Sequence, residues 1–240
     1  MVQSVIRGTL KQASAVVALG DAWAAQLHQI APKARINVIP NGIPLARRIT
    51  QPAPFQPVHV VFLGRIGERK GTFRLLEAWA KLAAELPPTG GAAPAIRTIA
   101  GDGEVEKARK LMSELGIEST VRLHDWLSQD DVHGLLDHAH VLVLPSRNEG
   151  QPMAVLEAMA RAMCVISSSA GGLGEMIGDD CGVIVPADDV DAIVDALRLV
   201  VADGDFRRQC GEAAYQRVRE QYDAGVVATQ IEDLYRWVCR

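Results

Sequence analysis

Hydrophobic and polar positions follow two patterns along this chain, and the two alternate almost from end to end. Short runs of apolar, β-branched residues predict buried strands, and apolar residues that recur every three or four positions predict amphipathic helices. The strands are predicted at residues 15–19, 36–39, 59–63, 96–100, 121–124, 140–144, 164–168 and 183–185. The helices are predicted at residues 22–30, 72–86, 104–115, 129–137, 153–162, 189–201, 206–221 and 224–238.

Alternating strands and helices, with strands that are apolar along their whole length, predict an α/β fold. Its sheet is expected to be parallel and covered by helices on both faces. Three local signals support the helix boundaries. Ser128 and Asp131 match a capping box, Gly116 follows the end of a helical pattern, and Pro152 suits the first turn of another helix.

Residues 44–57 interrupt both patterns because they include four prolines, Pro44, Pro52, Pro54 and Pro57. We therefore predict a linker there. The preceding residues 1–43 hold two predicted strands and one helix. So few elements cannot enclose a core, and this part needs packing partners from elsewhere.

Residues 58–221 hold the remaining predicted strands and form the main domain. Helical patterns follow one another at the C-terminus, and residues 222–240 contain the last of them. The apolar positions of this last helix predict a packing face. The helix is expected either to clasp the sheet or to cross to a neighbouring domain.

The composition of the chain argues against several classes of protein. The chain has 240 residues, of which 48% are hydrophobic and 22% charged, and its formal net charge is −4. These values are typical of a soluble globular protein and give no reason to expect nucleic acid as a partner. No uncharged apolar run approaches the roughly 18 residues of a membrane span, and the N-terminus does not match a signal peptide. We expect a cytoplasmic protein, with peripheral association at the inner face of the membrane as an open alternative.

The cysteines and histidines suggest no special chemistry. The four cysteines stand far apart, and we expect reduced, buried thiols at Cys164, Cys181, Cys210 and Cys239. The six histidines match no metal-binding spacing, so we expect no structural metal. Nucleophile elbows, P-loops and complete dinucleotide-binding motifs are also missing from the sequence, and we expect no cofactor.

The first candidate site is a basic turn after the strand at 59–63, in which Arg65, Arg69 and Lys70 precede a helix that starts near Thr72. Cations at a helix N-terminus oppose its dipole, at a cost of ~0.3–1 kcal/mol each. A bound phosphate resolves the conflict, because free N–H groups at a helix start bind anions and glycines allow close approach. The alternative is a solvated loop whose basic side chains point away.

The second candidate site contains two carboxylates. Glu149 follows the strand at 140–144, at the edge where open α/β sheets bind ligands. Glu157 lies in the next helix among apolar residues, where an unpaired carboxylate is costly, and a ribose diol supplies donors for both of its oxygens. We expect both carboxylates to face one crevice. The alternative is that Glu157 reaches solvent and pairs with Arg161 one turn later.

A third, weaker candidate is the glycine-rich turn at Gly171, Gly172 and Gly174, followed by Glu175. Its N–H groups can nest an anion, with Glu175 close by. The same glycines are equally explained by the geometry of a turn between a strand and a helix.

Together these segments resemble glycosyltransferase family 4, whose members have the GT-B fold of two facing Rossmann-like domains. Glu149 and Glu157 are separated by seven residues, as in the Glu-x7-Glu motif of that family. The resemblance extends over nearly the whole chain, and its other elements are Pro40-Asn41-Gly42-Ile43, Gly64-Arg65, Lys70-Gly71, Ala100-Gly101-Asp102-Gly103, Gly150, Ala158, Gly171-Gly172 and Glu175. It implies one half of a GT-B fold: a Rossmann-like doubly wound parallel sheet with C-terminal helices.

The carboxy-terminal domain of the family binds the nucleotide sugar, so the resemblance implies that residues 58–221 bind the donor. Arg65 and Lys70, beside Gly64, would hold the diphosphate, and Glu157 would bind the ribose. Glu149 would contact the transferred sugar together with the backbone of Gly150, Gln151, Pro152 and Met153. The nucleobase would lie near Gly101, Gly103, Asp125, Trp126 and Leu127.

The implied activity is that of a retaining hexosyltransferase that needs no metal. It would use a UDP- or GDP-hexose and a glycan or lipid-linked acceptor, with Glu149, Arg65 and Lys70 as catalytic residues that position the sugar and stabilise the departing diphosphate. Residues 1–43 resemble only the end of the family's amino-terminal acceptor domain, so a missing domain or a partner chain is expected. Gln151-Pro152 replaces the aromatic–glycine pair common in the family, which leaves the sugar preference open. The alternative function is a non-catalytic nucleotide-sugar-binding module that depends on a partner chain for transfer.

Overall fold

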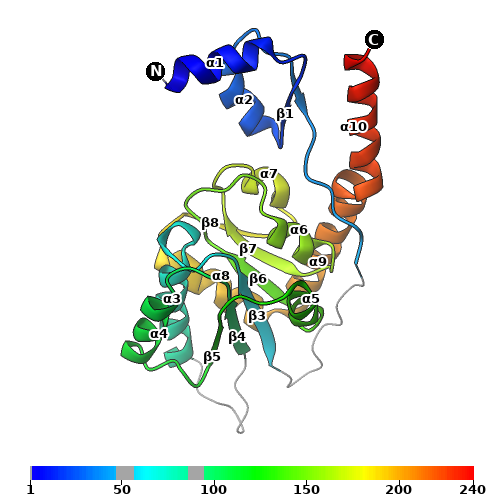
Figure 1. Ribbon diagram of the computed structural model, residues 1–240. Coiled ribbons are helices and arrows are strands. Elements are labelled where there is room, and N and C mark those ends of the chain that lie inside the picture. The colour runs from blue at the N-terminus through cyan, green and yellow to red at the C-terminus, as the bar shows by residue number, and fades with distance from the viewer. Residues whose placement is uncertain (1, 47–56, 86–94) are drawn as a thin grey trace.

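The computed structural model describes residues 2–46, 57–85 and 95–240 (Figure 1). Six parallel strands form the central sheet, in the order β5-β4-β3-β6-β7-β8. Their bounds are β3 Val58–Leu63, β4 Ala95–Ala100, β5 Val121–His124, β6 Val141–Leu144, β7 Cys164–Ser168 and β8 Gly182–Val185. Relative to the chain, the order is third, second, first, fourth, fifth, sixth, which is that of a Rossmann fold. The predicted doubly wound parallel sheet is confirmed.

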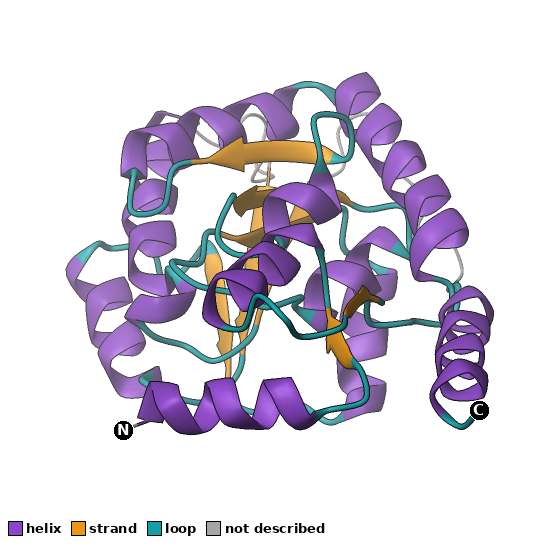
Figure 2. Ribbon diagram, turned by 90° about the horizontal axis from the view of Figure 1, so that it is seen from above, coloured by secondary structure: helices purple, strands orange, loops and turns teal. Residues whose placement is uncertain are grey.

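Helices cover both faces of this sheet, as the views from the side and from above show (Figures 1 and 2). One face carries α3 (Thr72–Glu85), α4 (Val105–Glu114) and α8 (Val190–Ala202), and the other carries α5 (Gln129–Asp137), α6 (Met153–Met159) and α9 (Gly204–Arg217). The short helix α7 (Leu173–Ile177) connects β7 to β8. Helices α3 and α8 are joined by the ion pairs Lys81–Asp191 and Arg198–Glu85, at 2.7 and 2.6 Å.

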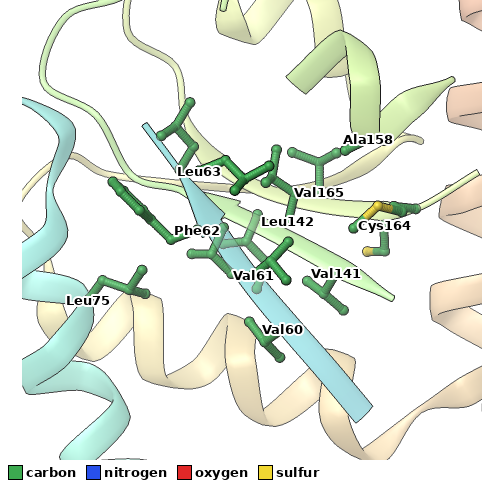
Figure 3. Close-up of a cluster of buried hydrophobic side chains, with 14 of the residues drawn as sticks. Val60, Val61, Phe62, Leu63, Leu75, Val141, Leu142, Ala158, Cys164 and Val165 are labelled. Carbon is green, nitrogen blue, oxygen red and sulfur yellow. The ribbon is translucent and has the colours of Figure 1, made fainter. Parts of the chain in front are cut away.

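The middle of the sheet is buried from both sides. Every residue of β6 and β7 is buried, and Figure 3 shows β3, β6 and β7 packed between Leu75 of α3 and Ala158 of α6. Burial on both faces explains why the sequence of these strands is apolar without alternation.

Each predicted strand and helix is present, most of them with bounds within two residues of the prediction. Helix α6 ends three residues before the predicted end, and Ala162, with φ +60°, lies in the turn that follows. A π-helical turn, Val218–Tyr222, continues α9. The sequence patterns missed α1 (Val2–Gln12), α7 and the short 3-10 helix Glu68–Lys70.

The predicted helix caps are found with one shift. Ser128 Oγ accepts a hydrogen bond from the backbone N–H of Asp131 at 3.2 Å, which confirms this half of the capping box. Gly116 has φ +65°, the left-handed conformation expected after a helix end. Pro152 precedes the first residue of α6, one position before the predicted one.

Residues 2–46, called the N-terminal segment from here on, lie beyond the carboxyl edge of the large sheet (Figure 1). They contain α1, α2 (Asp21–Ile30) and two parallel strands, β1 (Val16–Ala18) and β2 (Ile36–Val38). The last helix, α10 (Ala224–Val238), runs beside β2, where Arg35 lies 5.4 Å from the ring of Trp237. Most of the predicted linker at 44–57 falls at residues 47–56, outside the described part.

The cysteines are free, and Cys164, Cys181 and Cys210 are buried as predicted. Burial raises the pKa of Cys181 to about 12. The prediction of a buried thiol is wrong for Cys239, which is exposed because it caps the end of α10. Within the described ranges, no helix combines the length and the apolar character that a membrane crossing demands.

Candidate functional site

The candidate site lies where the strand order reverses, between the neighbouring strands β3 and β6. Both strands end at the same edge, and the turns that follow them touch through their backbones. The N–H of Arg147 donates to the carbonyl of Arg69 at 2.9 Å. Gly71 has φ +75° and lies so close to the Pro145 carbonyl that any side chain would collide with it. A glycine is therefore required at this contact.

A buried ion pair joins the two turns. Lys70 Nζ lies 2.6 Å from Glu149 Oε1, and the side chain of Glu149 is only 6% exposed. Ser146 Oγ donates to the same oxygen at 2.7 Å. The basic turn and the first carboxylate thus share one site, as the sequence predicted. The contribution of Ser146 was not predicted, although its position just after β6 was a signal for it.

The other two cations of the basic turn are more open to solvent. Arg65 is exposed and forms no ion pair within the described residues; it lines a hollow of about 430 Å³ with Gly67, Lys70 and Glu104. Arg69 donates to the Asn148 carbonyl at 3.3 Å. The solvated-loop alternative therefore does not hold for Lys70, which points inward.

The expectation of free N–H groups at the start of α3 is wrong for three residues. The N–H groups of Lys70 and Thr72 donate to the Gly67 carbonyl, and that of Gly71 donates to the Glu68 carbonyl. The 3-10 turn before α3 causes this, because it satisfies these donors internally. An anion at this turn would therefore depend mainly on the basic side chains.

The turn after β4 packs along the basic turn. Ile66 donates to the Asp102 carbonyl at 2.6 Å and accepts from the N–H of Glu104 at 2.9 Å. Gly101 and Gly103 have φ +153° and +109°, which side chains disfavour, so both glycines have a structural reason.

The predicted nucleobase region is close to these glycines. Gly101 donates to the carbonyl of His124, the last residue of the edge strand β5. Asp125, Trp126 and Leu127 follow directly, and Trp126 is 74% exposed. A large exposed ring at this edge is available for stacking.

Glu157, in α6, takes no part in the buried ion pair. Burial raises the pKa of its carboxyl group, and nearby Arg161 and His133 lower it. Arg161 instead forms its ion pair with Asp137, at 2.8 Å. Within the described residues, no ion pair or side-chain hydrogen bond engages the Glu157 carboxylate. The alternative of an Arg161 partner therefore fails, and a half-buried carboxylate stands without a donor.

The glycine-rich turn at residues 171–174, the third candidate site, packs against the turn that contains Glu149. Gly171, with φ +60°, packs on the Glu149 carbonyl, and the N–H of Gly172 donates to the Gly150 carbonyl at 3.3 Å. Glu175 binds the N-terminal segment. Its carboxylate accepts from the N–H groups of Asp21 and Ala22, at 2.9 and 2.6 Å.

The side chain of Gln151 likewise faces the N-terminal segment. Its Oε1 accepts from the N–H of Asn41, and its Nε2 donates to the Leu19 carbonyl at 3.3 Å. Pro152 and the 42% exposed Met153 then begin α6. At Gln151, the backbone remains for the sugar contact that the resemblance implies.

No cluster of three or more metal-ligating side chains is found in the described ranges. The residues that the structure brings together are cations, carboxylates and backbone turns along the carboxyl edge of a parallel sheet.

Comparisons with known proteins agree on one family. The family model described as glycosyl transferases group 1 matches residues 48–217. Glycogen synthase of Mycobacterium tuberculosis is 31% identical over 215 residues, which cover 84% of this chain and 48% of that protein. The chain spans about half the length of the curated relatives it matches, 55% and 48% for two of them.

Solved structures show the same fold. Sucrose-phosphate synthase of Thermosynechococcus elongatus has a TM-score of 0.84 and 24% identity, covering 98% of this chain and 61% of that one. Anabaena HepE, solved in complex with UDP-glucose, has a TM-score of 0.82 and 19% identity. The match covers 98% of this chain and 68% of the HepE chain.

Proposed function

Because this chain belongs to the glycosyl transferases of group 1, also called glycosyltransferase family 4, we propose that it is the donor-binding part of a retaining hexosyltransferase. Residues 58–221 bind a UDP- or GDP-hexose, which is transferred to a glycan or lipid-linked acceptor. The observation that carries the proposal is the buried Lys70–Glu149 contact at the point where the strand order reverses.

Each part of the donor has a proposed place. Arg65 and Lys70 hold the diphosphate, and Glu149 and the backbone of residues 150–153 contact the hexose. Glu157 accepts hydrogen bonds from the ribose, which supplies the donors that this half-buried carboxylate otherwise lacks. The nucleobase lies between the 101–103 turn and Trp126.

The chemistry follows from these places. The bond between the anomeric carbon and a diphosphate oxygen breaks, and the oxygen leaves with the electron pair. A new bond forms from the acceptor hydroxyl oxygen to the anomeric carbon on the same face of the sugar, and the hydroxyl proton passes to the departing diphosphate oxygen. Arg65 and Lys70 stabilise the departing charge, because they are in position before it develops.

The acceptor is proposed to bind to a further domain or a partner chain. The chain covers about half of its relatives, and this supports a site completed by other residues. The same observation favours a second reading, in which the chain captures nucleotide sugar and transfers nothing by itself. Release of UDP from UDP-glucose, with and without acceptor glycans, separates the two readings.

Calorimetric titration of the full chain with UDP-glucose, GDP-mannose and ADP-glucose tests donor binding. The UDP-glucose complex of the structurally similar HepE makes UDP-glucose the first choice. Arg65→Ala is expected to weaken UDP binding by ~1.5–3 kcal/mol, the range for hydrogen bonds to charged groups. The melting temperature should not fall, because Arg65 is exposed.

The matched control is Arg208→Ala, which removes an exposed cation of α9 and changes the net charge equally. It should leave UDP binding unchanged. If no nucleotide sugar binds, or if both variants lose the same affinity, the proposed donor site is wrong.

A further inference from the structure

Gln151 is a buried polar residue whose side chain is fully engaged outside the proposed donor site. It is 7% exposed, and both ends of its amide bind backbone groups of the N-terminal segment, at Asn41 and Leu19. Its own carbonyl accepts from Asn41 Nδ2 at 3.3 Å. Leu19 follows β1 and Asn41 follows β2, so one residue connects to the ends of both strands.

Glu175 makes a second connection, independent of the first. Helix α2 begins at Asp21, and Gly20 at its N-cap has no side chain to cap it. The Glu175 carboxylate, which lies outside the N-terminal segment, caps the helix instead by accepting hydrogen bonds from the N–H groups of Asp21 and Ala22. A negative charge at a helix N-terminus also interacts favourably with the helix dipole.

The turn that both residues adjoin is the one proposed to contact the hexose. Trp23 Nε1 donates to the Gly150 carbonyl at 3.4 Å, and Gly172 donates to the same oxygen from the other side. Turn 149–151 is therefore held between the N-terminal segment and the turn that leads to Glu175.

Hydrogen bonds, more than apolar packing, hold the two parts together here. A hollow of about 350 Å³ lies beside the contact, lined by Asp21, Gln151, Glu175 and Tyr222 among others. The open space means that few apolar contacts would resist a displacement at this point. The geometry of turn 149–151 thus depends on a few polar partners.

We infer that Gln151 and Glu175 are positioning residues, which clamp the N-terminal segment to turn 149–151 and thereby set the shape of the hexose subsite. The diphosphate subsite at Arg65 and Lys70 lies on the β3 side of Glu149, and the side chains of Gln151 and Glu175 do not bond to it. The hexose part of this inference rests on the proposed function; the clamp itself does not.

Titration of the full chain with UDP and with UDP-glucose tests the effect on ligands. Gln151→Ala should weaken UDP-glucose binding about tenfold, the equivalent of one or two lost hydrogen bonds, and leave UDP binding unchanged. Gln151→Glu keeps the acceptor for Asn41 and should restore part of the loss. Gln216→Ala, on α9, is the control for an amide that does not touch the clamp. Equal losses for both ligands, or no loss for either, would overturn the inference.

Amide hydrogen exchange tests the clamp without any ligand. In Glu175→Ala, the amides of Asp21 and Ala22 should exchange about fivefold faster or more, and exchange in turn 149–151 should rise with them. Glu175→Gln, which keeps one acceptor oxygen, should lie between the variant and the wild type. Glu77→Ala, which removes a partly exposed carboxylate on α3 far from the clamp in the chain, is the control.

The two arms separate the two claims. Unchanged exchange at turn 149–151 in Glu175→Ala would remove the clamp, whatever binds. Faster exchange in a chain that binds neither UDP nor UDP-glucose would keep the clamp and reject the proposed donor.

Discussion

Glu157 combines a cost to the fold with a proposed use. Burial raises the pKa of its carboxyl group above the ordinary value of 4.5, against the opposite effects of Arg161 and His133. A carboxyl group with a raised pKa in the folded state favours folding only while it is protonated. Stability is therefore lost as the pH rises from the unfolded pKa through the folded one.

Glu157→Gln should consequently change stability and binding in opposite directions. At pH 7 the variant should melt at a higher temperature than the wild type, and the difference should disappear below the unfolded pKa. Binding of uridine should weaken by ~1.5–3 kcal/mol, because a charged acceptor for the ribose hydroxyls is lost. Pyrophosphate binding should not change. Melting curves across pH and two titrations check this, and a variant that binds uridine normally would separate Glu157 from the ribose.

Some contacts between individual site residues were predictable from the sequence, and others were not. Lys70 and Glu149 follow strands that are neighbours in the Rossmann-like order, which the family resemblance implied, so their proximity could be predicted. The partners of Gln151 and Glu175 lie 110 and 154 residues away, at Asn41 and Asp21. Such partners depend on how the segments pack, which no local pattern specifies.

Helix α9 packs against the turn after α6 by direct backbone contact. Gly211 lies against the Ala162 carbonyl, so close that a methyl group there would overlap it. Gly134 of α5, in contrast, has no atom within 4 Å of the position of an added Cβ. The two glycines are a matched pair in helix interiors with opposite surroundings.

Alanine should therefore have opposite effects at the two positions. Gly134→Ala should stabilise the protein by ~0.5–1 kcal/mol, because alanine restricts the unfolded chain and favours helix. Gly211→Ala should destabilise it by ~1–3 kcal/mol, because α9 must move away from the sheet. Urea unfolding of both variants measures this. Stabilisation by Gly211→Ala would mean that the backbone contact is looser than described.

The hydrophobic pattern predicted most helices and strands and missed two α-helices. The long amphipathic helices and the buried strands have strong periodicity, and each was predicted. Helix α1 is the exception, because its residues are also amphipathic and it was not predicted; it contains Gly8, and its Val5 and Ile6 are 64% and 43% exposed. Helix α7 has only five residues, too few to show a period.

The molecule as a whole is unevenly buried. Strands β6 and β7 are buried throughout, whereas β1 has one buried residue, Ala18, and β2 has none. Valine side chains on these two short strands are nearly half exposed, 46% for Val17 and 43% for Val38. The N-terminal segment therefore has little apolar contact of its own.

Hydrogen exchange should reveal this difference as two levels of protection. Amides of β1 and β2 should exchange at least ~100-fold faster than those of β6 and β7, because local opening requires less free energy where few apolar contacts are lost. Mass spectrometry of exchanged peptides resolves the two regions. Equal protection in both would mean that the N-terminal segment opens only when the whole protein unfolds.

Near its end, the N-terminal segment is bound to the chain just before α10. Ile43 donates to the Tyr222 carbonyl at 2.8 Å and accepts from the N–H of Ala224 at 3.0 Å, so the outgoing and returning strands are paired. These two hydrogen bonds hold the end of the N-terminal segment beside the start of α10. If the contacts of Gln151 and Glu175 open, their partners stay at a high effective concentration. Reclosure is then an intramolecular step whose rate does not change on dilution.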